Sequence, residues 1–274
     1  MSKAFDDLVS IMARLRAEGG CPWDREQTHV SLKPFLIEEA YEVIEAIESG
    51  QAESLCEELG DVLFQVLFHA EIAKEEQRFD IEAVLRTSSE KMTRRHPHVF
   101  LEAEAKGEGL NSAEVLARWE DIKKKEPRNQ ERQSALDGVP RSLPPLLRAH
   151  QIQARASRVG FDWTSPEPVF SKIEEELQEL REALSEANAT TPENGASTRK
   201  IENEIGDLLF SIVNFARFKK INPEDALRKT IHRFTERFQS IERQAKEKGT
   251  SIESFSLEEM NVIWEHAKAE EQIE

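Results

Sequence analysis

The chain contains few cysteines and few turn-forming residues. Its 274 residues include 2 cysteines, 11 glycines and 11 prolines. Two cysteines are too few for a disulfide framework, so we expect a reducing, cytoplasmic location. Sandwiches and barrels usually need more turn residues, whereas 38% hydrophobic and 33% charged residues are typical of a helix-rich protein. The composition therefore favours an all-α fold.

Long apolar runs and an excess of positive charge are also absent. The longest apolar stretch covers residues 62–70, far short of the roughly 20 residues that a membrane span needs, and the N-terminus lacks the apolar run of a signal peptide. Asp and Glu number 53 against 37 Lys and Arg, a net charge of −16 that repels a phosphate backbone. We therefore expect no membrane and no nucleic-acid partner.

Apolar residues at helical spacing predict helices separated by polar or glycine-containing breaks. The expected helices cover residues 4–17, 34–48, 52–76, 81–93, 113–124 and 146–159, with loops at 21–29 and 188–199. Four prolines lie between residues 127 and 145, which is typical of a boundary. We expect a helical domain at 1–126, a linker at 127–145 and a second helical domain at 146–274.

The two halves repeat each other, which favours two tandem helical-bundle domains. Glu38-Glu39-x-x-Glu42 in the first half corresponds to Glu175-Glu176-x-x-Glu179 in the second. Further along, Glu58-Leu59-Gly60-Asp61 corresponds to Glu204-Ile205-Gly206-Asp207.

The repeated acidic residues are candidate metal ligands. Helical residues three or four apart share a face, so Glu39 with Glu42, and Glu58 with Asp61, converge if their helices pack antiparallel. The same spacing relates Glu176 to Glu179 and Glu204 to Asp207. Clustered carboxylates cannot all stay ionised without a cation, and oxygen ligands without Cys or His favour Mg²⁺ over zinc.

Two other interpretations of these acids are weaker. Glu-rich helices usually present a solvated face, but apolar residues surround Asp61 and Asp207 in both copies. A di-iron bundle needs Glu-x-x-His on two helices, and the single such spacing, Glu26 to His29, lies in the expected loop.

Basic and aromatic residues recur downstream of the acids. Arg233 and Arg237 lie one turn apart and could clamp phosphate oxygens or form an exposed basic face. Lys91 and Arg95 stand at the matching places in the first half. Trp119 and Trp264 also correspond, and each could stack on a base or fill a core.

Together with Cys21-Pro22-Trp23-Asp24 and Gln27-Thr28-His29, these motifs resemble the MazG family of nucleoside triphosphate pyrophosphohydrolases over nearly the whole chain. The resemblance implies a tandem all-α NTP pyrophosphatase fold, a homodimer, and Mg²⁺ as cofactor, with Mn²⁺ as a substitute. It implies hydrolysis of nucleoside triphosphates of broad base range, with deoxynucleotides as further candidate substrates, to monophosphate and pyrophosphate, serving control or cleaning of the nucleotide pool. It also implies that the C-terminal half is usually the competent one.

The resemblance assigns roles to residues as well. The magnesium ligands would be Glu176, Glu179, Glu204 and Asp207, with Glu39, Glu42, Glu58 and Asp61 as a second possible site. The nucleotide site would include Lys172, Ile173, Glu174, Glu175, Glu176, Lys200, Ile201, Glu202, Asn203, Asp207, Arg233, Arg237 and Trp264. Their N-terminal counterparts are Lys91, Arg95 and Trp119, and Lys91 is a point charge where the second copy has an arginine fork.

The acidic motif also offers a candidate general base. Glu175 is the candidate that orients or deprotonates the attacking water, and attack at the α- or β-phosphorus would give the same products. The chain could instead be a nucleotide sensor that binds NTP with Mg²⁺ without turnover, or a helical scaffold whose acids only face solvent.

Overall fold

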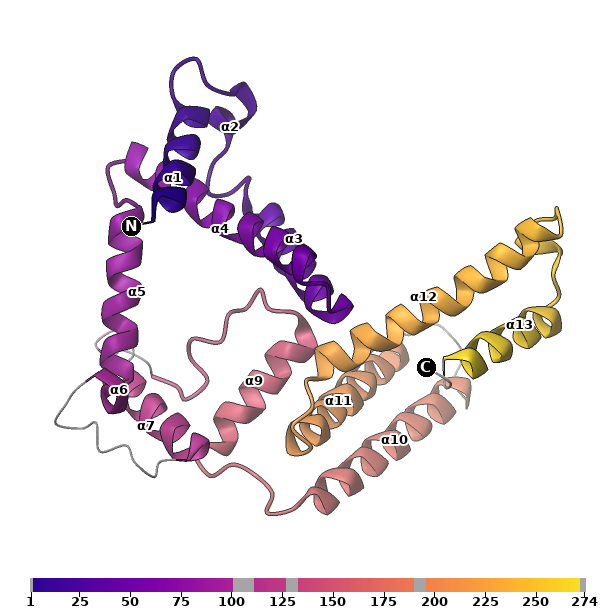
Figure 1. The fold of residues 1–274 in the computed structure, drawn as a ribbon. Coiled ribbons are helices and arrows are strands. Elements are labelled where there is room, and N and C mark those ends of the chain that lie inside the picture. The colour runs from indigo at the N-terminus through magenta and orange to yellow at the C-terminus, as the bar shows by residue number, and fades with distance from the viewer. Residues whose placement is uncertain (1, 101–110, 127–132, 190–195, 272–274) are drawn as a thin grey trace. The chain divides into compact units, whose positions relative to one another are not determined.

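The computed structural model describes residues 2–100, 111–126, 133–189 and 196–271. These ranges are helical and contain no strand, which confirms the all-α prediction (Figure 1). None of the described helices is long and apolar enough to cross a membrane. Contacts divide the chain into two compact units, residues 1–130 and 131–274, and each unit is described by itself. Of the expected linker, residues 127–132 lie outside the described residues.

Unit 1 is built around a long helix against which its neighbours pack. Its elements are α1 (Lys3–Arg16), α2 (Pro22–Glu26), α3 (Lys33–Ser49), α4 (Ala52–Glu75), α5 (Ile81–Arg95), α6 (Pro97–Phe100) and α7 (Ser112–Lys125). α4 contacts α1, α3 and α5, and α7 contacts α5. The buried cluster between α1 and α4 contains Met12, Leu32, Leu67, Phe68 and Ile72. This core is built from apolar residues of α1 and α4 together with Leu32, which directly precedes α3.

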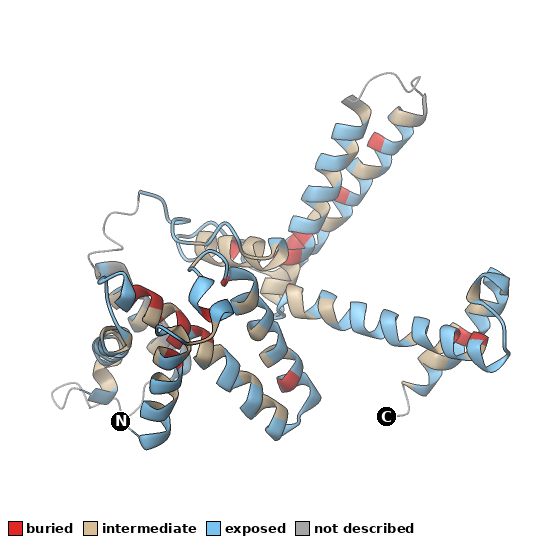
Figure 2. Ribbon diagram, turned by 90° about the horizontal axis from the view of Figure 1, so that it is seen from above, coloured by how far each residue is buried: buried red, intermediate tan, exposed pale blue. Residues whose placement is uncertain are grey.

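Unit 2 repeats the central hairpin of unit 1. Its elements are α9 (Pro145–Ser157), α10 (Pro166–Ala189), α11 (Ala196–Phe218), α12 (Pro223–Glu247), the 3-10 turn η1 (Ile252–Ser254) and α13 (Leu257–Glu270). α10 packs on α11, α9 contacts α11 and α12, and α13 packs on α12. Figure 2 shows that the helices leading to the C-terminus carry mostly exposed residues.

Helix ends largely follow the local signals in the sequence. Gly50 ends α3 in the left-handed conformation, with φ 69°, and the Asn222 side chain caps the start of α12. Two expected loops were wrong in part. The loop at 21–29 contains α2, because Pro22 at the first helical position fixes a helical φ. The loop at 188–199 is shorter than predicted, because α11 begins at Ala196.

Candidate metal and nucleotide site

Three carboxylates of unit 2 meet between α10 and α11. Carboxylate oxygens of Glu176, Glu204 and Asp207 all lie within 4.8 Å of one another. Glu176 is only 5% exposed, whereas Asp207 is exposed, so the group opens to solvent on one side. The helical spacing brings the two α11 acids to one face, and the packing of α10 on α11 adds Glu176.

Glu179 lies beside this group rather than within it. Its side chain is one turn after Glu176 and is exposed. Partial shielding from water, and then the neighbouring Glu176 and Glu204 charges, raise the pKa of the Glu179 carboxyl. The structure therefore gathers three of the four predicted ligands closely and leaves the fourth within electrostatic reach.

The same arrangement recurs in unit 1 between α3 and α4. Carboxylate oxygens of Glu39, Glu58 and Asp61 lie within 4.8 Å of one another. Partial burial raises the pKa of Glu39, and the charges of Glu42 and Asp61 add to this effect. Shielding followed by the charges of Glu42, Glu57 and Asp61 raises the pKa of Glu58. Mutual repulsion is thus a shared property of both groups.

The donor set suits a hard divalent cation. Each group offers only carboxylate oxygens, the ligands that Mg²⁺ prefers, and contains neither the His nor the Cys of a typical zinc site. Shielding from water and then mutual repulsion raise the pKa values of Glu39, Glu58 and Glu179, and a cation would relieve the repulsion. The residues present therefore fit the metal that the sequence predicted.

Lys172 links the predicted general base to the carboxylate group of unit 2. Its Nζ lies 2.7 Å from Glu175 Oε1 and 2.8 Å from Glu176 Oε1. The hydrogen bonds that Lys172 donates to these two carboxylates raise the pKa of the lysine, so it stays charged. Glu175 is exposed and lies outside the group of three, which leaves its carboxylate accessible to a water molecule.

Other predicted nucleotide-site residues occupy the same two helices. Lys200, at the start of α11, donates to Glu186 Oε2 at 2.7 Å. Glu174, Glu202 and Asn203 are exposed, and Ile173 and Ile201 are half-buried. All five residues lie on α10 or α11, the two helices that carry the carboxylate group.

The predicted arginine and tryptophan of unit 2 form a separate group between α12 and α13. The guanidinium carbon of Arg237 lies 5.4 Å from the centre of the Trp264 ring. Its Nε and Nη2 donate to Glu271 at 2.7 and 2.6 Å, a bidentate pair that lowers the pKa of Glu271. Arg233 is exposed and donates to Thr230 at 2.9 Å.

Unit 1 contains the equivalent group. The Arg95 guanidinium carbon lies 5.0 Å from the Trp119 ring centre, and its Nε donates to Glu126 at 2.9 Å. Hydrogen bonds from Arg95 and Arg94 lower the pKa of Glu126 to about 2 despite partial burial. Lys91 is half-buried on α5.

The acids of these groups were missed by sequence reasoning. Glu126 and Glu271 each stand seven residues after the repeated tryptophan, so extending the repeat alignment would have found them. Without the structure, nothing pointed to a contact between these acids and the arginines.

The structure does not bring the arginine group to the carboxylate group. Among the described residues, no ion pair joins Arg233 or Arg237 to Glu176, Glu204 or Asp207. Within the described part of unit 2, α13 packs on α12 and not on α10.

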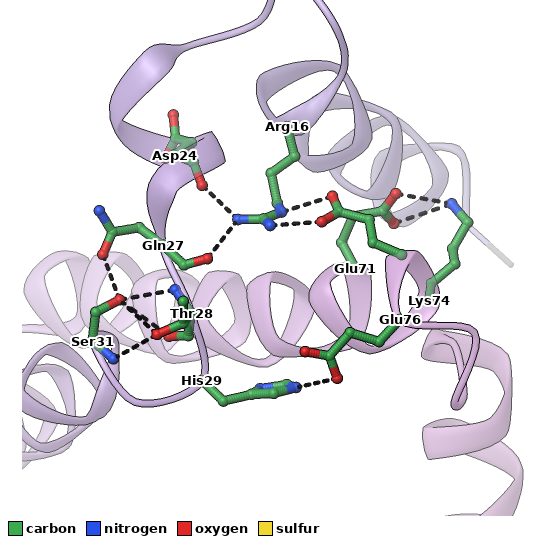
Figure 3. A network of polar contacts seen from close by, with 10 residues as sticks. Arg16, Asp24, Gln27, Thr28, His29, Ser31, Glu71, Lys74 and Glu76 are labelled. Carbon is green, nitrogen blue, oxygen red and sulfur yellow. Dashed lines mark hydrogen bonds and ion pairs between the residues drawn. The ribbon is translucent and has the colours of Figure 1, made fainter.

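The segment 21–29, which carries two of the motifs, is held by Arg16 (Figure 3). Arg16 donates to the main-chain carbonyls of Asp24 and Gln27, and its other edge pairs with Glu75 at 2.8 and 2.6 Å. His29 Nδ1 lies 2.8 Å from Nδ1 of His69, and its Nε2 lies 3.8 Å from Glu76 Oε2. These contacts give the segment a structural role in unit 1.

Known proteins resemble the chain over nearly its full length. The family model described as the MazG nucleotide pyrophosphohydrolase domain matches twice, at residues 27–100 and 164–241. The chain is 47% identical to the nucleoside triphosphate pyrophosphohydrolase/pyrophosphatase MazG of Thermotoga maritima, covering 96% of this chain and 95% of the relative. It is 45% identical to the nucleoside triphosphate pyrophosphohydrolase of Escherichia coli strain K12, covering 97% and 98%.

Proposed function

The chain belongs to the MazG nucleotide pyrophosphohydrolase family, and on this premise we propose that it hydrolyses nucleoside triphosphates to nucleoside monophosphate and pyrophosphate with Mg²⁺. Relatives of 45–47% identity are named for this class of reaction. The proposed substrates are nucleoside triphosphates of broad base range, with a role in nucleotide-pool control in the cytoplasm. The single observation that carries the proposal is the grouping of Glu176, Glu204 and Asp207.

The carboxylates of unit 2 would hold the metal, with Glu179 as a fourth ligand. When bound, Mg²⁺ polarises a phosphoryl oxygen and lowers the pKa of coordinated water. Glu175, exposed and next to the group, would accept the proton of the attacking water. Lys172 stays charged between Glu175 and Glu176, and would offset negative charge on the triphosphate at the same place.

Arg233, Arg237 and Trp264 remain proposed nucleotide contacts. Arg237 is pre-oriented over Trp264 by its bidentate pair with Glu271. A planar fork of this kind suits a phosphate better than the point charge of a lysine. The carboxylates of unit 1 are a second candidate metal site. Because Lys91 stands there in place of Arg233, we expect weaker phosphate binding in unit 1 than in unit 2.

Turnover and metal removal test the proposed function directly. The purified chain incubated with ATP and Mg²⁺ should release AMP and pyrophosphate, measured by ion-exchange chromatography, and Mn²⁺ should substitute. Chelation with EDTA should abolish product formation, because the carboxylates alone repel the triphosphate. Calorimetric binding of ATP and Mg²⁺ without any pyrophosphate would instead favour a nucleotide sensor. Hydrolysis in ¹⁸O-labelled water would identify the phosphorus attacked by showing which product carries the label.

A homodimer is the proposed assembly. Ile205, Leu209 and Ile212 lie on one face of α11, and all three are 45–48% exposed. Leu177 and Leu184 on the adjoining α10 are also exposed. An apolar stripe of this kind is a poor solvent surface, and a second copy with the same stripe would cover it.

Light scattering after gel filtration tests the assembly. The wild-type chain should have twice the chain mass, and Leu209→Glu should shift the population toward monomer, because a charge would be buried in the interface. Leu257→Glu is the matched control, since Leu257 is 74% exposed at the start of α13 and away from the stripe. A monomeric wild type would contradict the proposed homodimer.

A further inference from the structure

A cavity in unit 2 adjoins the carboxylate group. It has a volume of about 400 Å³, within the range of pockets that hold small ligands. Lys172, Glu176 and Asp207 line it on the side of the carboxylates, and Phe161, Trp163 and Phe210 contribute aromatic surface. A single cavity therefore joins the proposed metal and phosphate site to an apolar space lined by rings.

One wall of this cavity carries a buried hydrogen-bond acceptor. Gln153 on α9 lines the cavity and is only 7% exposed. Its Nε2 donates to the main-chain carbonyl of Phe210 at 2.8 Å, and its Oε1 accepts no hydrogen bond from any residue that the structure describes. The bond to Phe210 fixes the orientation of the amide, because exchanging the two ends would place two acceptors against each other. A buried acceptor left unpaired costs stability, so the site suits a ligand that donates a hydrogen bond.

The repeat shows that one wall of this cavity differs between the two units. Asn214 follows Glu204 by the same ten residues that separate Phe68 from Glu58. In unit 1, Phe68 is 2% exposed and packs in the apolar core with Met12 and Leu67. In unit 2, Asn214 lines the cavity, and its Oδ1 accepts from Arg217 Nε at 2.9 Å. A phenyl ring thus fills unit 1 at the position where unit 2 has a polar wall.

We propose that this cavity binds the nucleobase of the triphosphate and that Gln153 Oε1 accepts a hydrogen bond from the base. The proposal rests on the proposed function, because the triphosphate must lie at Glu176 and Asp207. Aromatic walls suit the flat faces of a base. Adenine and cytosine have an amino group on the pairing edge, and guanine, uracil and thymine have a ring N–H there. A fixed acceptor can therefore bind each common base without choosing among them, which gives the proposed broad base range a physical cause.

Purine riboside 5′-triphosphate tests the role of Gln153, because it is ATP without the 6-amino group and its pairing edge has no N–H donor. The wild type should hydrolyse it with kcat/KM about 10- to 100-fold below that for ATP, since Oε1 stays buried and unpaired. Gln153→Leu should reduce this ratio to below about threefold, mainly by raising KM for ATP. Gln151→Leu, on the same helix but not lining the cavity, is the matched control and should keep the wild-type ratio.

Asn214→Phe provides a second, independent variant. It introduces the residue of the first copy, and it should raise KM for ATP at least about tenfold by filling the cavity. Circular dichroism confirms that each variant is folded before its kinetics are compared. The proposal is overturned if the wild type treats the two triphosphates alike, or if Gln153→Leu keeps the wild-type ratio. If the wild type releases pyrophosphate from neither triphosphate, the proposed function itself fails. Equal kcat/KM for the two triphosphates would refute only the base site at Gln153.

Discussion

Glu204→Gln and Asp207→Asn will each lower pyrophosphate release from ATP and Mg²⁺ by at least about 100-fold. Both substitutions keep the size of the side chain but remove one negative charge from a group whose oxygens lie within 4.8 Å of one another. The loss of a ligand charge weakens metal binding, so raising the Mg²⁺ concentration should partly restore the rate. The rate is measured at saturating ATP over a Mg²⁺ titration.

Two further variants complete this experiment. Glu242→Gln removes an exposed acid of α12 and should leave the rate within about twofold of the wild type. Glu58→Gln, in the carboxylate group of unit 1, measures the share of activity that belongs to the first half, and we expect a smaller loss than for Glu204→Gln. Wild-type rates in both unit 2 variants would contradict the assignment of the metal site to α10 and α11.

Arg16→Ala will lower the free energy of unfolding by about 3 kcal/mol. The Arg16 side chain is 6% exposed and bonds two main-chain carbonyls of the segment 21–29 together with Glu75. Its removal takes a donor away from both carbonyls, although Asp24 O keeps the hydrogen bond from Gln27 N–H at 3.3 Å and the partly exposed Glu75 side chain can regain water. Urea unfolding followed by circular dichroism measures the change. Arg25→Ala, an exposed arginine of the same segment, should cost less than about 0.5 kcal/mol.

The stabilising pair between Arg16 and Glu75 should also depend on pH. The hydrogen bonds from Arg16 lower the pKa of Glu75 below its ordinary value of 4.5. Because the folded-state pKa is lower than the unfolded one, the contribution is complete above pH 4.5 and is lost as pH falls through the folded value. The difference in stability between wild type and Arg16→Ala should therefore shrink from pH 7 to pH 3. A difference that stays constant over this range would show that the Glu75 charge contributes nothing.

Much of the candidate site could be predicted because its spacing is local. Glu204 and Asp207 are three residues apart, so any helix through them places both carboxylates on one face. The apolar residues around them predicted a buried setting, but Ile205, Leu209 and Ile212 are 45–48% exposed in the chain. The repeat in the sequence then predicted the same arrangement at Glu58 and Asp61, and the structure has both groups.

Other features lay beyond local reasoning because they join residues far apart in the chain. Arg237 and Glu271 are 34 residues apart, Gln153 and Phe210 are 57 apart, and Arg16 and Glu75 are 59 apart. Lys172, by contrast, was predicted near the phosphate site, and its ion pairs with Glu175 and Glu176 follow from spacings of three and four on one helix. Sequence reasoning therefore missed these three contacts, whose partners lie on different helices and are not paired by any motif that the sequence analysis identified.

The sequence by itself determined an all-α chain, its internal repeat and the paired acids, because helical periodicity and repeated motifs are properties of neighbouring residues. Only the tertiary structure decided that Arg237 lies over Trp264 and pairs with Glu271, with no ion pair to Glu176, Glu204 or Asp207 among the described residues. It alone revealed a buried, unpaired acceptor on Gln153 beside those carboxylates. Burial and hydrogen-bond pairing depend on which helices pack together, and the periodicity of one helix does not determine its neighbours.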